Sequence, residues 1–142
     1  MSQSVASIRA NIVNSLGELD GFTLSLQSPD YFGRTQNTIA HKAFTVQCLT
    51  STATEDKQRR AVGLYINTQY RLMFAYRLRP QDIYPTDYDN ALNTESNVIN
   101  SVMSVYSSNN KFTLNYVGSE RVVTDSQEYI IISIDFIAKH TI

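Results

Sequence analysis

Residues 69–79, QYRLMFAYRLR, alternate strictly between large apolar side chains and side chains of mixed character. A period of two is typical of a β-strand that places one face on a core. The first face is entirely apolar and consists of Tyr70, Leu72, Phe74, Tyr76 and Leu78. The second face carries Arg71, Met73, Ala75, Arg77 and Arg79. The stretch therefore predicts a long strand with its apolar face inward and its arginine face toward solvent or a partner protein.

Three other stretches show the same alternation. Their apolar faces consist of Phe44, Val46 and Cys48 in residues 44–50, of Phe112, Leu114 and Tyr116 in residues 111–117, and of Ile130, Ile132, Ile134 and Phe136 in residues 129–137. Residues 61–66 predict a further strand that turns at Asn67-Thr68. Pro80 and Pro85 end the central strand, because proline cannot donate a ladder hydrogen bond.

The second face of residues 129–137 is unusual. It consists of Tyr129, Ile131, Ser133, Asp135 and Ile137. This face is too apolar for full exposure to water and too polar for a dry core. The pattern therefore favours a contact between subunits.

Two stretches have helical periodicity. Val5, Ile8, Ile12 and Leu16 recur at spacings of three and four, with Ser4 as a suitable N-cap and Gly17 or Gly21 as a suitable end. The second stripe consists of Val98, Val102, Val105 and Tyr106, with Ile99 and Met103 beside it. We expect the second helix to begin near Asn93 or Thr94, to carry Glu95 in its first turn, and to end at residues 107–110.

The order of these elements predicts an α+β fold over a single domain, residues 1–142. Its sheet would be antiparallel or mixed, with both amphipathic helices packed on one face. Residues 27–41 are polar and predict a long connecting loop. Residues 51–60 are polar without periodicity, and they predict a projecting loop or the tip of a long hairpin.

Composition limits the possible settings of the protein. Only 18% of the 142 residues are charged and the formal net charge is −1, so nothing attracts the whole chain to nucleic acid or to an anionic membrane. The single cysteine, Cys48, indicates no disulfide framework. Residues 1–17 lack a signal-peptide core, and the longest apolar-rich stretch, residues 129–138, is too short to span a bilayer. We therefore expect a protein that is made in the cytoplasm and has no membrane partner.

The sequence offers no constellation for catalysis. Cys48 could be a nucleophile with His41 or His140 as base, but its place on an apolar strand face is more typical of an inert buried thiol. The histidines lack the spacing of a metal site, and the single glycines form no phosphate-binding loop. The carboxylates of residues 82–95 do not fit a calcium loop, and Asp87 and Asp89 read as turn residues at the start of a helix. We expect no enzyme activity, no metal and no cofactor.

Charges are separated along the chain. Residues 57–79 contain six basic residues and no acidic one, and residues 80–110 contain four acidic residues and no basic one. This split could be an accident on a solvated surface, a patch for nucleic acid, or a head-to-tail contact between copies of the chain. Because positive charge is not in excess, the subunit contact ranks above nucleic acid. The candidate interface residues are Lys57, Arg59, Arg60, Arg71, Arg77, Arg79, Asp87 and Asp89.

Two segments carry a family resemblance. Residues 76–80, YRLRP, and residues 87–95, DYDNALNTE, resemble the middle of the tail-terminator and tail-completion family of long-tailed bacteriophages. In that family a long strand stops at an Arg-Leu-x-Pro-like sequence, an acidic turn follows, and a helix begins. The order of elements extends the resemblance over most of the chain. The family's projecting polar loop corresponds to residues 51–60.

The resemblance implies a structural virion protein without catalytic residues, assembled in the host cytoplasm. Its partners would be further copies of itself in a ring, expected to be a hexamer, together with the tail tube protein and a neck protein. The ring would cap the tube, stop its polymerisation and join it to the neck, and DNA would only pass through it. A head–tail connector or stopper is the nearest alternative. A second alternative is a nucleic-acid-binding accessory domain that uses Arg71, Arg77, Arg79 and nearby tyrosines.

Overall fold

The computed structural model describes residues 4–25, 41–53, 65–79, 84–108, 112–124 and 128–141. The elements in chain order are α1 (Val5–Gly17), β1 (Thr23–Leu24), β2 (Ala43–Ala53), β3 (Tyr65–Arg77), α2 (Tyr84–Ser108), β4 (Thr113–Val123) and β5 (Tyr129–Thr141). The strands form one sheet in the order β1-β2-β3-β5-β4. β1 runs parallel to β2, and every other pair is antiparallel. The α+β class with a mixed sheet and two packed helices is confirmed.

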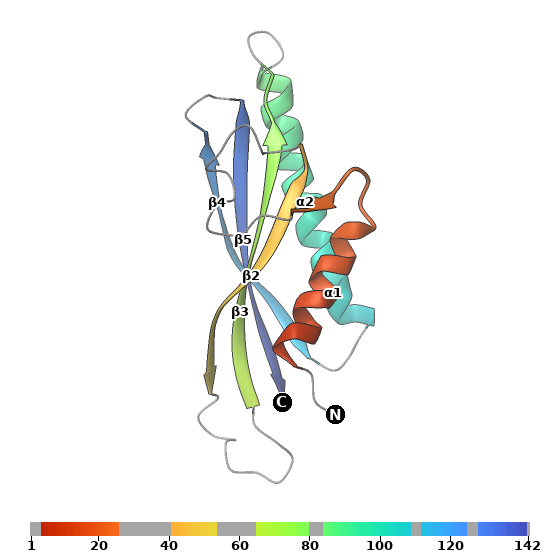
Figure 1. The fold of residues 1–142 in the computed structure, drawn as a ribbon, viewed down its shortest axis with the longest axis vertical. Helices are drawn as coiled ribbons and strands as arrows, with labels where there is room; N and C mark the ends of the chain where they lie inside the picture. The colour runs from red at the N-terminus through yellow and green to blue at the C-terminus, as the bar shows by residue number, and fades with distance from the viewer. Residues whose placement is uncertain are drawn as a thin grey trace.

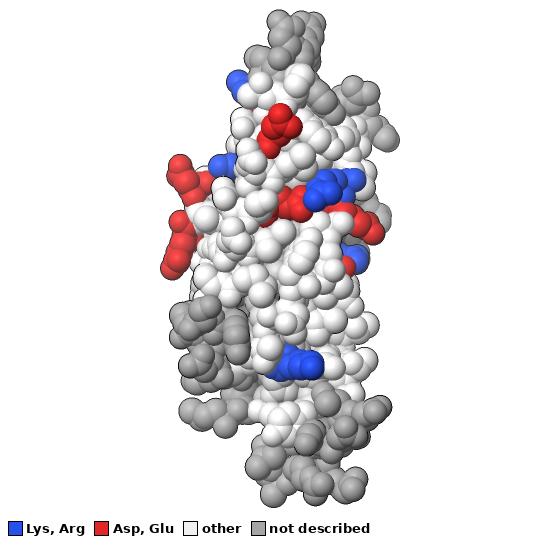
Figure 2. Space-filling view, turned by 180° about the vertical axis from the view of Figure 1, so that it is seen from behind, with Lys and Arg blue, Asp and Glu red and all other residues white. Residues whose placement is uncertain are grey.

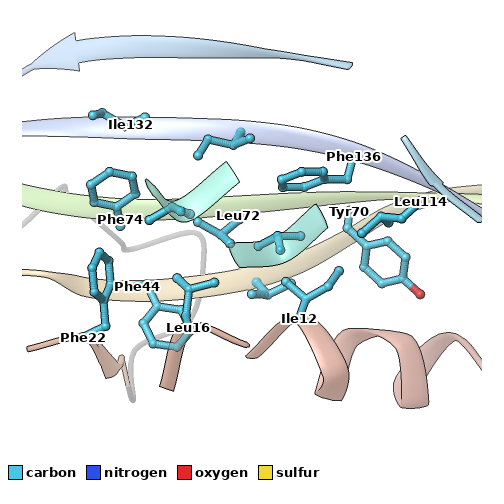
Figure 3. Close-up of a cluster of buried hydrophobic side chains, with 14 of the residues drawn as sticks. Ile12, Leu16, Phe22, Phe44, Tyr70, Leu72, Phe74, Leu114, Ile132 and Phe136 are labelled. Carbon is cyan, nitrogen blue, oxygen red and sulfur yellow. The ribbon is translucent and has the colours of Figure 1, made fainter. Parts of the chain in front are cut away.

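One hydrophobic core lies between the sheet and both helices (Figures 1 and 3). The apolar face of residues 69–79 is its centre, because Tyr70, Leu72 and Phe74 have no exposed surface. They are paired in register with Phe136, Ile134 and Ile132 of β5, whose side chains lie on the same face. Polar contacts also join the helices to the sheet and to each other. The Tyr70 hydroxyl donates to the Val5 carbonyl at 2.8 Å, and the Ser101 hydroxyl donates to the Ser15 carbonyl at 3.0 Å.

The first helix follows its predicted pattern. Ile8, Ile12 and Leu16 are completely buried, and Val5 packs against the same core. Ser4 is the N-cap, with its side chain accepting the Ser7 N–H at 3.1 Å. The last helical residue is Gly17, as the sequence indicated.

The second helix begins earlier than predicted. α2 starts at Tyr84 rather than near Asn93 or Thr94, so Pro85 belongs to its first turn and does not simply stop the strand. Proline is tolerated there because the first turn has no intrahelical acceptors for its N–H groups. Glu95 consequently lies in the middle of the helix, where it is buried. The predicted end at residues 107–110 agrees with the observed end at Ser108.

The central strand is longer than predicted. Residues 67 and 68 continue β3 and do not form a turn. The Thr68 hydroxyl is buried and bonds both to the Ser51 hydroxyl at 2.9 Å and to His140 Nε2 at 2.9 Å. These partners on β2 and β5 satisfy the hydroxyl of Thr68, which in the sequence looked like a turn residue. Residues 61–64, the rest of the predicted first strand, lie outside the described residues.

Cys48 lies on the predicted strand face but is not buried. It is opposite Tyr70 on the core side of the sheet, yet its side chain is exposed. The buried stretch of β2 ends at Val46, and a register shift between Cys48 and Thr50 follows. The prediction of a buried thiol is therefore wrong. The predicted loop of residues 27–41 is described only at His41, and the polar loop of residues 51–60 only at residues 51–53, where it still forms part of β2.

The opposite face of the sheet has a small second cluster. Ala43, Ala75 and Ile131 are buried together there, with Met73 and Tyr129 packed around them. Ala75 belongs to the arginine face of β3, which was expected at solvent or at a partner, and it has no exposed surface. That face is consequently part apolar and part charged.

Candidate functional site

The end of the sheet where β3 stops contains a cleft of about 250 Å³. It is lined by His41, Tyr76, Arg77, Arg79 and Asp87. These residues come from the start of β2, the end of β3 and the first turn of α2. Three of them, Arg77, Arg79 and Asp87, were candidates from sequence, and the structure places all three at one site.

Arg79 and Asp87 form a bidentate ion pair in the wall of the cleft. Arg79 Nε and Nη2 donate to the two carboxylate oxygens at 3.0 and 2.8 Å, and the Arg79 backbone N–H donates to Oδ2 at 2.8 Å. These three hydrogen bonds from Arg79 lower the pKa of Asp87 to about 2. The pair also raises the pKa of Arg79. The two charges therefore largely cancel each other within the chain.

His41 is oriented by the backbone and by an aromatic neighbour. Its Nδ1 accepts the Arg77 backbone N–H at 3.1 Å, and its ring meets the Tyr76 ring edge-to-face with centroids 4.6 Å apart. Partial burial, followed by the charges of Lys42 and Arg77, lowers the pKa of His41. The imidazole is therefore neutral near pH 7, and because Nδ1 accepts, its proton is on Nε2.

The remaining sequence candidates are not at this cleft. Arg71 binds Asp135 of β5 through two hydrogen bonds of 2.9 and 3.1 Å, on the same face of the sheet as Arg77 but six residues earlier in β3. Asp89 is exposed on α2, two residues beyond Asp87. Lys57, Arg59 and Arg60 lie outside the described residues. Two of the three arginines of the β3 face are thus neutralised within the chain, which makes that face a weaker candidate for nucleic acid than the sequence indicated.

A third ion pair within the chain was not predicted from the sequence. Arg121 of β4 donates to both carboxylate oxygens of Glu95 at 2.6 and 2.8 Å. Glu95 belongs to α2, and its side chain is buried. The signal in the sequence was the position of Glu95 within the helical stripe that continues to Val98 and Val102. A carboxylate on a buried stripe requires a partner, and the structure supplies it from a strand. Figure 2 shows one side of the molecule, on which charges of both signs lie next to one another across the upper half.

The outer edge of β4 is the other feature that sequence did not indicate. β4 is the last strand of the sheet, and no described strand pairs with its outer side. Tyr116, Val117 and Val122 are 43%, 54% and 61% exposed. A register shift between Tyr116 and Gly118 leaves Val117 without a partner on β5. Large apolar side chains therefore gather along one open edge.

The described residues allow two candidates from the sequence to be checked, a metal site and a pairing of Cys48 with a histidine. The described residues contain no cluster of three or more His, Cys, Asp or Glu that could hold a metal ion. His41 lies beside Tyr76 and His140 is paired with Ile66, so about 33 Å of strand separates the two histidines. Partial burial raises the pKa of Cys48, which disfavours a thiolate at neutral pH. No described helix is long and apolar enough to cross a membrane.

We expect that substitution of Asp87 by asparagine will reduce the dependence of the unfolding free energy on pH in the acid range. The folded-state pKa of Asp87 is lowered, so its contribution is fully present above the unfolded-state pKa of about 3.9 and is lost as the pH falls toward 2. Urea unfolding of both proteins from pH 7 to pH 2 should show a difference in unfolding free energy that shrinks between about pH 4 and pH 2. Asp89→Asn is the matched control. A difference that is unchanged at the lowest pH would contradict the assignment.

Comparison with known proteins does not assign the chain to a family. No protein family profile matches the chain, and no curated protein is significantly similar to it.

Proposed function

We propose that this chain is a structural subunit that assembles with copies of itself, and that the assembly is the ring ending the tail tube of a long-tailed bacteriophage. The open edge of β4 carries the first part of this proposal. An exposed strand edge offers a row of backbone donors and acceptors to another chain, and apolar side chains along it strengthen that contact. Tyr116, Val117 and Val122 supply such side chains.

The opposite edge of the sheet supports this interpretation by contrast. There, β1 pairs with only two residues of β2, through Ala43 and Phe44. The next outward carbonyl, that of Val46, accepts the Arg9 side chain at 2.7 Å. Protection of one edge by a short strand and an arginine is how proteins avoid unwanted pairing. The edge of β4 is interrupted by a register shift between Tyr116 and Gly118, but no described strand covers it, which fits an edge that a second copy occupies.

The tail of a bacteriophage is the more specific part of the proposal. Its support is the likeness of residues 76–80 and 87–95 to the tail-terminator family, together with the order of elements. In this chain the first segment includes Arg77 and Arg79, and the second includes Asp87 and Asp89. The resembling residues thus surround the cleft at the end of β3. A head–tail connector shares the requirement for a ring and is the nearest alternative.

The proposal is tested by observing the purified protein and then adding tail tubes. Size-exclusion chromatography with light scattering should give a closed oligomer, and negative-stain electron microscopy should show rings. When the rings are mixed with purified tubes of a long-tailed phage, they should bind one end and prevent further growth. Binding to the head portal instead would indicate the connector. A protein that stays monomeric at every concentration would contradict self-assembly.

A further inference from the structure

Among the candidate arginines that the structure describes, Arg77 alone is outside an ion pair. Arg71 is paired with Asp135 and Arg79 with Asp87, so the charges of these two arginines are already balanced. Arg77 is exposed, and its guanidinium has no ion pair among the described residues. Only its backbone N–H is used, in the bond to His41. Of the β3 arginines, Arg77 is therefore the one available to an outside ligand.

The cleft around Arg77 has the chemistry of a carboxylate site. A guanidinium presents a planar fork of donors that matches a carboxylate. His41 adds a second donor, because its Nδ1 is an acceptor and the proton of the neutral ring is on Nε2. Asp87 does not repel an incoming anion strongly, because three hydrogen bonds from Arg79 neutralise it. The lining consequently holds one uncompensated positive charge.

Asp89 is the acidic side chain best placed to supply that carboxylate from another molecule. It is exposed and forms no ion pair within the described chain. Successive helical residues are rotated by about 100°, so Asp89 projects about 200° away from Asp87, on the opposite flank of α2. Asp87 faces the cleft. Asp89 therefore lies at the same end of the molecule as the cleft but points away from it.

The other exposed carboxylates of the described chain fit less well, and Glu128 already lines a hollow with Arg77 and Arg79 of its own chain. Glu120 lies on the sheet face that carries Arg71, and its charge already acts on Arg71 of its own chain. Glu18 and Asp20 follow the end of α1, and the Asp20 carbonyl accepts the Lys42 ammonium group at 3.2 Å. A site on one flank and its ligand on the other flank, at the same end, is the arrangement that a head-to-tail contact requires.

We propose that the cleft formed by His41 and Arg77 binds the Asp89 carboxylate of a second copy of this chain. The inference rests on the proposed self-assembly and assigns to it a heterologous contact. When this contact is repeated from one subunit to the next, the assembly grows in one direction. It closes into a ring when the rotation between neighbouring subunits allows. Its contribution is a charge-assisted contact that fixes the orientation of neighbours, while β4 supplies apolar area.

Charge reversal tests the proposed contact directly. Arg77→Glu and Asp89→Arg should each weaken assembly, because each places like charges opposite one another, and the dissociation constant should rise at least about tenfold. The double variant restores opposite charges and should recover the oligomer. Assembly is measured by light scattering, and thermal unfolding establishes that each variant is folded. Lys139→Glu and Glu18→Arg are matched controls at exposed positions away from the cleft, and they should assemble normally.

Each outcome decides between the proposals. If the wild-type chain is an oligomer and Arg77→Glu leaves it unchanged, the contact is wrong while self-assembly stands. If both single variants dissociate and the double variant does not recover, Asp89 is not the ligand and the inference fails. If the wild-type chain is a monomer, both the contact and the proposed function fail. Recovery in the double variant alone supports the inference.

Discussion

Lysine at both Val117 and Val122 is expected to convert the assembled protein into monomers. These two side chains are 54% and 61% exposed on β4, the last strand of the sheet. Lysine on an edge strand prevents pairing with another chain, because the incoming strand would have to bury or displace a strongly hydrated charge. Two such charges at a repeated contact should weaken assembly by more than about 100-fold, since desolvation of the lysines and lost apolar area act together at every interface.

The fold should tolerate these changes. Val117 is the unpaired residue at the register shift of β4, and Val122 lies opposite Ile131, whose surface the lysine stem can still cover. The matched control is Leu24→Lys, which makes the same type of change at a 43% exposed position on the opposite edge. Light scattering should find that control assembled and the β4 double variant monomeric. If the β4 variant assembles normally while folded, β4 is not the contact.

The sequence predicted strands better than it predicted the start of α2, and the reason is physical. Strand predictions rested on side chains that the core demands, such as Tyr70, Leu72 and Phe74. The first turns of α2 hold Pro85 and Asp87, which do not resemble a helical stripe, because this part of the helix meets Arg79 and the cleft. Where a buried position is polar and paired, hydrophobic periodicity gives no signal.

The same reasoning explains the polar positions within the sheet. Asn67-Thr68 looked like a turn because both side chains are polar and short. In the structure Thr68 is buried and bonded to Ser51 and His140, which come from the two neighbouring strands. Such partners are far away in the chain and cannot be inferred from local sequence. They are known only once the register of β2, β3 and β5 is known.

The arrangement of charges differs most clearly between the linear sequence and the folded structure. In the sequence, basic residues precede acidic ones, which favoured a contact between separate molecules. In the structure, the chain turns back after β3 so that Arg79 meets Asp87, and β4 brings Arg121 to Glu95. Among the described charges of the two segments, Arg71, Arg79, Asp87 and Glu95 are therefore paired within one molecule. The proposed contact uses what is left over, the Arg77 guanidinium and the Asp89 carboxylate, and not the whole of either segment.

Substitution of Phe74 by alanine should be the most destabilising single change in the core. Phe74 has no exposed surface and meets the Phe22 ring edge-to-face at 5.6 Å between centroids (Figure 3). Phe22 in turn meets Phe44 at 6.2 Å, so the three rings pack as one group. Removal of the Phe74 ring loses its burial and leaves a cavity, which costs about 3–5 kcal/mol. For a domain of this size the melting temperature should fall by roughly 10 °C or more.

Met73→Ala is the matched comparison, because Met73 is the chain neighbour of Phe74 and points to the other face of the sheet. It packs only at the border of the small cluster around Ala75 and is half-buried. Its loss should therefore cost about 1 kcal/mol, well below the cost at Phe74. Both values come from urea unfolding of each variant. Equal losses at the two positions would mean that both faces of β3 are packed alike, and the placement of both helices on one face would then be wrong.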